Sequence, residues 1–214
     1  MARSQQPLTP LAMAILELLH EHELHPYEMT QLMRHRRVDR RVKLRPGSLY
    51  HTVERLASQG FIEVVDTQRQ GRRPERTVYA VTEKGRDTFA EQTREMLGTP
   101  AEEYPHYPVA LSAAAELERA DAIEQLRLRV VNLKARIAAD QVLIDQVLTE
   151  DLPYLYWADH AFSHHQRKSE LDWTEKLVAD LESGRISWPD GDKPADLPQL
   201  SLLKSQEDAD GLAS

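Results

Sequence analysis

Residues 46–81 read PGSLYHTVERLASQGFIEVVDTQRQGRRPERTVYAV, and the organisation of the chain follows from this stretch. Its first residue suits the first turn of a helix, because a helix leaves its first amides unpaired and proline has no amide hydrogen to lose. Leu49, Val53 and Leu56 then recur at spacings of four and three residues, which places one apolar stripe on a helix. Gly60 is expected to end that helix, since glycine readily adopts the left-handed conformation of a C-terminal cap.

Two antiparallel strands are expected directly after this helix. Residues 61–65 and 77–81 are rich in β-branched and aromatic side chains, and the polar segment 67–76 joins them. The alternation at 42–44 indicates a short strand that could join the sheet as a third member. A helix with a polar outer face, followed by a hairpin with a basic tip, is the layout of a winged helix.

The distribution of charge favours a polyanion-binding surface in this region. The whole chain carries 27 Lys and Arg against 35 Asp and Glu, a formal net charge of −8. Within residues 34–76, in contrast, 12 Lys and Arg face 5 Asp and Glu. One concentrated basic segment in an acidic protein indicates a local contact with a polyanion such as nucleic acid.

Three further helices are expected around this stretch. Thr9 is a residue type that caps helices, and the first helix is expected to run from there to about Glu21. Pro26 is expected to start a second helix that ends among residues 34–37, and a fourth helix is expected over 82–97. The apolar sides of these helices can close a small core beneath the hairpin.

The pattern predicts four parts of the chain. A DNA-binding domain is expected at 1–98, a linker at 99–108, a helical domain at 109–186 and a tail at 187–214. The linker contains three prolines. The tail is rich in Pro, Asp, Ser and Gly, and is expected to be disordered.

The helical domain is expected to consist of two long amphipathic helices. Apolar residues between about 119 and 150 alternate at spacings of three and four, a coiled-coil-like pattern, and a second helix follows Pro153 to about 183–184. Two such helices leave apolar surface to spare, which favours a homodimer. The residues expected at the dimer interface are Ile123, Leu126, Val130, Leu133, Ile137, Leu171, Val178 and Leu181.

Candidate DNA-binding residues lie mainly in and beside the helix at 46–60. Side chains in the first turns of such a helix reach base edges or phosphates in a major groove, and residues just before it suit phosphate contact. Arginines at the hairpin tip could clamp phosphates or enter a minor groove. The candidates are Tyr27, Lys43, Arg45, Ser48, Tyr50, His51, Arg55, Arg72 and Arg73, with electrostatic support from Arg36, Arg37, Arg40 and Arg41.

Aromatic and histidine residues near the start of the second long helix suggest two other sites. Tyr154, Trp157 and Phe162 could line a pocket for a small aromatic effector, although such residues also serve as core or interface. His160 and His164 share a helix face and could bind zinc, but the Glu of a metalloprotease motif is missing between them. Without a nucleophile motif or a phosphate-binding glycine loop, we expect no enzyme activity, no metal and no cofactor.

Five motifs in a fixed order resemble the PadR family of transcriptional regulators. They are LTPLAMAIL from residue 8, HPYEM from 25, RPGSLYHTVERL from 45, GFIE from 60 and RTVYAVTEKGR from 76. The family's Gly-Ser-Leu-Tyr element corresponds to 47–50, and its closing Tyr-x-Leu-Thr-x-x-Gly to 79–85, with Val81 in the Leu place. The resemblance covers about 8–90. It implies a winged helix-turn-helix that binds operator DNA as a homodimer, usually as a repressor, with a helical C-terminal part for dimerisation.

These observations predict a mainly α-helical protein. Three helices and a small antiparallel β wing form a winged helix-turn-helix, which precedes a coiled-coil-like dimerisation domain. The expected function is a cytoplasmic homodimeric repressor, released from double-stranded operator DNA by a small-molecule effector. A winged-helix module that binds only proteins is an alternative, and a metal-dependent enzyme built on His160 and His164 is a second. The chain lacks the run of about 18 apolar residues that a membrane span needs, and the absence of cysteine fits a reducing compartment.

Overall fold

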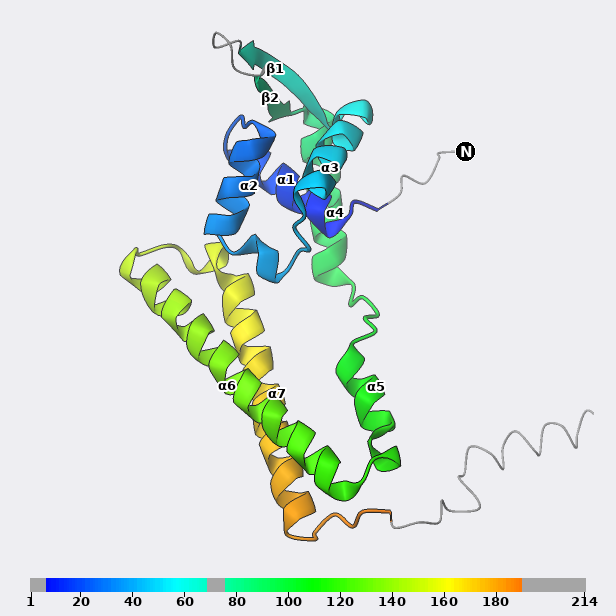
Figure 1. Ribbon diagram of the computed structural model, residues 1–214. Helices are drawn as coiled ribbons and strands as arrows, with labels where there is room; N and C mark the ends of the chain where they lie inside the picture. Colours follow the sequence, from blue (N-terminus) through cyan, green and yellow to red (C-terminus); the bar gives the residue numbers. More distant parts are fainter. Residues whose placement is uncertain (1–6, 69–75, 190–214) are drawn as a thin grey trace, which may run out of the picture. The chain divides into compact units, whose positions relative to one another are not determined.

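The computed structural model describes residues 7–68 and 76–189 and divides into two compact units, 1–103 and 104–214 (Figure 1). The predicted fold class is confirmed, with a small two-stranded sheet in the first unit and two long helices in the second. The first unit holds α1 (Pro10–Glu21), α2 (Pro26–His35), η1 (Val38–Arg40), α3 (Pro46–Ser58), β1 (Ile62–Gln68), β2 (Arg76–Val81) and α4 (Glu83–Gly98). The second holds α5 (His106–Ser112), η2 (Ala114–Glu116), α6 (Arg119–Thr149), η3 (Tyr154–Tyr156) and α7 (Ala158–Glu182).

The helices of the first unit begin and end where local chemistry satisfies their free backbone groups. The side chain of Thr9 accepts from the amide of Ala12 at the start of α1, and His25 forms a capping box with Glu28 at the start of α2. Gly60 has a φ of 73° just after α3. Its amide donates to the carbonyl of Ala57, and the next amide donates to Leu56, a pairing that closes a helix end.

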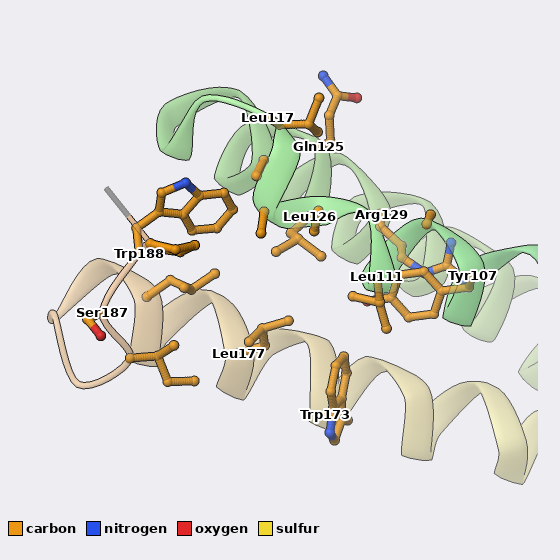
Figure 2. Close-up of a pocket in the computed structure, with 17 residues that line it drawn as sticks. Tyr107, Leu111, Leu117, Gln125, Leu126, Arg129, Trp173, Leu177, Ser187 and Trp188 are labelled. Carbon is orange, nitrogen blue, oxygen red and sulfur yellow. The ribbon is translucent and has the colours of Figure 1, made fainter. Parts of the chain in front are cut away.

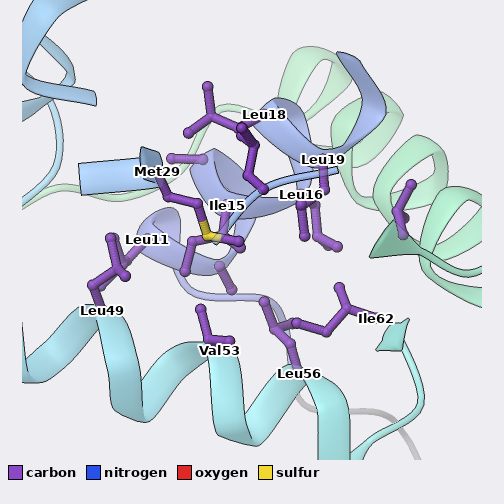
Figure 3. Packing of buried hydrophobic residues seen from close by; sticks show 14 of the residues in the cluster. Leu11, Ile15, Leu16, Leu18, Leu19, Met29, Leu49, Val53, Leu56 and Ile62 are labelled. Atoms are coloured by element: carbon purple, nitrogen blue, oxygen red, sulfur yellow. The ribbon is translucent and has the colours of Figure 1, made fainter. Parts of the chain in front are cut away.

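One hydrophobic core holds α1, α2, α3 and the hairpin together (Figure 3). Ile15 and Leu16 of α1 are fully buried, as is Met29 of α2, and Figure 3 shows them facing the leucines of α3. Burying such a side chain contributes about 1.5–3 kcal/mol. The core therefore fixes which face of each helix points outward.

The sheet has two strands in the described residues, and its third contact comes from an unexpected place. β1 and β2 pair antiparallel from Ile62 opposite Val81 outward, with a register shift between Val64 and Asp66. The predicted strand at 42–44 is wrong, because those residues form no strand. Instead Leu24, in the turn between α1 and α2, exchanges two hydrogen bonds with Tyr79 of β2, each 3.1 Å long.

A close backbone contact joins the start of α4 to the base of the hairpin. Thr82 caps α4 by accepting from the amide of Gly85 at 3.1 Å, and its own hydroxyl donates to the carbonyl of Gly60 at 2.8 Å. A Cβ atom at Gly85 would lie 2.0 Å from the carbonyl oxygen of Phe61 and 2.9 Å from a methyl group of Val81. Only glycine fits there without a shift of the backbone.

The second unit is built on α6 and α7, which lie side by side (Figure 1). α6 begins at Arg119 as predicted, but α7 begins at Ala158, after the short turn η3. α5 begins at His106, so helix occupies the end of the segment predicted as linker. The proposed tail, residues 187–214, lies largely outside the described residues, which end at 189.

None of the helices in the described ranges is both long enough and apolar enough to span a membrane.

Candidate nucleic-acid interface

The core holds α3 so that its polar face points outward. Leu49, Val53 and Leu56 are buried on one side. Tyr50 on the other side is 44% exposed, and Ser48, His51 and Arg55 are exposed as well. The four residues predicted for DNA contact in this helix therefore share an accessible surface. Movement of that surface would disrupt the core, which makes it a rigid platform.

The start of α3 has the properties of an anion-binding site. Arg45 occupies the N-cap, and no side chain there accepts a hydrogen bond from the first-turn amides. Gly47 has open space where a side chain would stand. Lys43 and Arg45 are both exposed beside this end. Free amides, the positive end of the helix dipole and two cations together suit a phosphate group.

Two neighbours orient the predicted contact residues, and the sequence pattern gave no sign of either. The guanidinium of Arg55 donates to the hydroxyl of Thr9 at 3.2 Å, which ties it to the start of α1. His51 lies 3.5 Å from a carboxylate oxygen of Glu54. Glu54 places a negative charge beside His51. Contact with a hydrogen-bond donor on a base edge is therefore favoured there over contact with a phosphate.

Tyr27 lies at the start of α2 and is 57% exposed. Its amide donates to the ring of His25 at 3.0 Å, as part of the cap that fixes this end of α2. The Tyr27 side chain thus projects from a well-anchored turn of the unit that carries α3.

Part of the predicted electrostatic support is neutralised within the protein. Arg36 binds both carboxylate oxygens of Glu21, at 2.6 and 2.7 Å. These hydrogen bonds hold the pKa of Glu21 below its ordinary value and raise the pKa of Arg36. Arg41 lies 3.7 Å from Glu17. Arg36 and Arg41 therefore act partly as ties between α1 and the segment after α2.

The hairpin tip falls outside the described residues. Arg72 and Arg73, predicted to contact DNA, both belong to 69–75, and their role stays a prediction. The described strands β1 and β2 lead to this tip from the end of α3.

The predicted dimerisation residues lie where α6 meets α7 within one subunit. Ile123, Leu126 and Leu133 of α6 are buried, as are Val178 and Leu181 of α7, while Val130, Ile137 and Leu171 are half-buried. Ion pairs flank this seam and join the same two helices. They are Arg127–Glu182, Arg129–Glu170, Lys134–Glu175 and Arg167–Asp140. The periodicity thus marks contact between two helices of the same chain, and dimerisation through these residues stays a prediction.

The aromatic residues predicted for an effector pocket are only partly enclosed. Tyr154 is 59% exposed and Phe162 is 62% exposed, whereas Trp157 is half-buried with its ring edge-on to Tyr154 at 4.8 Å. The indole Nε1 of Trp157 and the Nδ1 of His164 are buried, and neither has a hydrogen-bond partner among the described residues. Two unpartnered polar atoms, one at the residue before α7 and one in its second turn, leave hydrogen bonds available to a ligand or a second chain.

The described residues include no group of three or more His, Cys, Asp or Glu side chains placed to hold a metal ion. His160 and His164 alone are too few for the closed or three-ligand sites that zinc forms.

Comparison with known proteins agrees with this geometry. Residues 15–91, from α1 into α4, match the model of the Transcriptional regulator PadR-like family. These residues are therefore similar to the PadR-like family. The resemblance found in the sequence motifs is therefore confirmed over these residues, and the family that they match consists of transcriptional regulators rather than enzymes.

Solved structures share the fold of this chain. Bacillus subtilis PadR in complex with operator DNA has a TM-score of 0.70 and 18% identity, covering 81% of this chain and 99% of that chain. The same protein in complex with p-coumaric acid has a TM-score of 0.68 and 17% identity, covering 84% and 99%. The Vibrio cholerae virulence activator AphA has a TM-score of 0.63 and 17% identity, covering 81% and 98%. No curated protein matches the chain in sequence.

Proposed function

We propose that this PadR-like regulator is a homodimeric repressor that binds operator DNA through α3 and the hairpin, and that a small-molecule effector releases it. The observation that carries the proposal is the outward face of α3, where exposed polar side chains adjoin a helix start without a side-chain cap. The existence of a similar protein, Bacillus subtilis PadR, in complex with operator DNA adds support.

In this proposal α3 enters the major groove with Ser48, Tyr50 and His51 towards base edges. Lys43 and Arg45 bind phosphates at its start, where the free amides add to the attraction. Arg72 and Arg73 reach the neighbouring backbone or minor groove. Two-fold symmetry would place two such half-sites about 34 Å apart on the duplex.

An exposed apolar stripe on α6 supports a dimer. Leu128, Val131 and Val142 are more than half exposed, and with Ala135 and Ala138 they follow spacings of three, four, three and four. This stripe lies apart from the positions that pack on α7. Contiguous exposed apolar surface of this kind commonly marks a protein interface. A second copy of α6 or α7 would cover it.

The effector part of the proposal follows the aromatic cluster at Tyr154, Trp157 and Phe162. A ligand there could accept a hydrogen bond from the unpartnered indole of Trp157. Titration with a panel of phenolic compounds and drugs should change the tryptophan fluorescence. An unchanged spectrum across the panel would count against this site.

A gel-shift titration tests DNA binding directly. DNA from upstream of the protein's own gene is compared with scrambled DNA at two salt concentrations. Selective binding with a steep salt dependence is expected. Binding no tighter than to scrambled DNA would refute the proposal and favour the protein-interaction alternative.

Variants that remove positive charges at different places locate the interface. Lys43→Ala with Arg45→Ala, and separately Arg72→Ala with Arg73→Ala, should weaken binding to every sequence and reduce the salt slope by about one per lost contact. Arg94→Ala removes one exposed positive charge from α4 and should leave the slope unchanged. If Arg94→Ala lowers DNA affinity as much per removed charge as the other variants do, the binding depends on net charge alone and not on these positions.

A further inference from the structure

A second site lies in the C-terminal unit, at a pocket distinct from the aromatic cluster around Trp157. Its volume is about 500 Å³, within the roughly 300–1,000 Å³ of typical small-molecule sites. It lies between α5 with the following turn η2, the first turns of α6, the last turns of α7 and the segment 186–189 (Figure 2).

Aromatic and aliphatic side chains form most of its wall. Figure 2 shows Trp188 beside Leu126 at one end and Tyr107 with Trp173 at the other. The rings of Tyr107 and Trp173 meet edge to face at 6.3 Å and 86°. The Tyr107 hydroxyl also lies 3.2 Å from the hydroxyl of Thr174, which fixes the ring to α7. This end of the pocket is thus preformed, so a flat ligand would lose little free energy in ordering it.

The charge of the wall is already balanced. Arg129 is the cation among the lining residues, and it donates two hydrogen bonds to Glu170. Its guanidinium also stacks 3.4 Å from the centre of the Tyr107 ring. An anionic ligand would have to displace the Glu170 carboxylate or lie close to it, and like charges so placed repel. The side chains of Gln125 and Ser187 add uncharged polar groups to the wall.

We propose that this pocket binds a flat, uncharged aromatic molecule with a single polar substituent. Ring faces and edges offer the stacking geometry that aromatic pairs prefer. Because Arg129 is already paired with Glu170, a carboxylate is not the preferred substituent of the ligand. Any effect of this ligand on operator binding rests on the proposed function, whereas its binding to the pocket does not.

Calorimetric titration of the full chain with two probes tests both the site and the ligand class. 2-Naphthol is uncharged at neutral pH, and 2-naphthoate has the same rings with a carboxylate. We expect 2-naphthol to bind and 2-naphthoate to bind about tenfold more weakly or worse. No heat with 2-naphthol would overturn the proposal, and tighter binding of 2-naphthoate would overturn the ligand class.

Adjacent alanines provide matched variants. Ala114 of η2 lines the pocket, whereas Ala113 is exposed and does not line it. Ala114→Trp should fill the pocket and lower the affinity for 2-naphthol by about tenfold or more, whereas Ala113→Trp should leave this affinity unchanged. Trp188→Ala removes one aromatic side chain of the wall from the segment after α7, and it should also weaken binding of the probe. This second variant keeps the test decisive if Ala114→Trp fails to fold. Equal affinity in wild type, Ala114→Trp and Trp188→Ala would overturn the site.

A parallel gel shift separates the two proposals. A protein that binds its operator but gives no heat with 2-naphthol refutes the pocket alone. If the protein binds 2-naphthol, Ala114→Trp weakens that binding and the wild type binds no operator, the proposed function alone is refuted.

Discussion

Replacing Gly85 by alanine is expected to destabilise the N-terminal unit through one backbone contact. The added Cβ would lie 2.0 Å from the carbonyl oxygen of Phe61, where atoms cannot approach so closely. Rotation of a side chain cannot relieve the clash, because the nearest atoms belong to the backbone. The start of α4 must therefore move away from the base of the hairpin.

The magnitude follows from two opposing effects. Overpacking of a tight site costs about 1–3 kcal/mol, and a rigid backbone neighbour places Gly85→Ala at the upper end. Alanine in a helix regains about 1 kcal/mol relative to glycine. The expected net loss is about 2 kcal/mol, which corresponds to roughly 10 °C in the melting temperature of a unit of this size.

Thermal unfolding of the full chain, followed by circular dichroism, measures this loss. Hydrogen exchange with mass spectrometry should place the lost protection in peptides from residues 1–103. Gly98→Ala is the matched control, because it lies in the same helix with nothing within 4 Å of its added Cβ. A Gly85→Ala protein as stable as the Gly98→Ala protein would refute the reasoning.

Three other changes test separate contacts. Glu21→Gln should lower stability by less than about 1 kcal/mol at neutral pH, since both side chains of its pair with Arg36 are more than a third exposed to solvent. Because folding lowers the pKa of Glu21, the difference in stability from wild type should persist above the pKa of the unfolded state and vanish as the pH falls through the pKa of the folded state. Arg167→Met should cost about 3 kcal/mol by removing a cation that lies 2.7 Å from buried Asp140, and chemical denaturation should show much of that loss restored in the double variant with Asp140→Leu. Val131→Asp with Val142→Asp should convert the proposed dimer to a monomer in light scattering without loss of helix, and a mass equal to that of the wild type would exclude the exposed stripe of α6 as the interface.

Local sequence patterns were sufficient to predict most of the N-terminal fold. Thr9 and Gly60 act on the backbone within a few residues, so helix ends could be placed from composition alone. The third contact of the sheet could not be predicted in this way, because a single residue, Leu24, supplies it from a turn that has no strand pattern. The segment 42–44 alternates in the same way as a strand, but it pairs with no strand of the described residues.

Periodicity and composition were less informative about partners. The stripe that includes Ile123 and Leu126 was predicted to lie at the dimer interface, but the spacing does not distinguish contact with a helix of the same chain from contact with a helix of a second copy. Likewise Arg36 adds a positive charge in a count, yet Glu21, distant in sequence, binds it. The pocket beside Trp188 combines four separate segments, and no local pattern could indicate their meeting.

The ion pairs along α6 and α7 determine which helices can be neighbours. Most of them place the cation on α6 and the anion on α7, so two copies of α6 brought together along this face would repel each other. Each pair joins one α6 to one α7, and exchange of α7 between two copies of the chain would preserve all of them. The segment between α6 and α7 therefore decides whether α6 packs on α7 of its own chain or on α7 of a second copy. In this joint Asp151 adopts a φ of 51°, and η3 follows it. A joint that was longer or straighter would change which copy supplies α7 while leaving the seam itself intact.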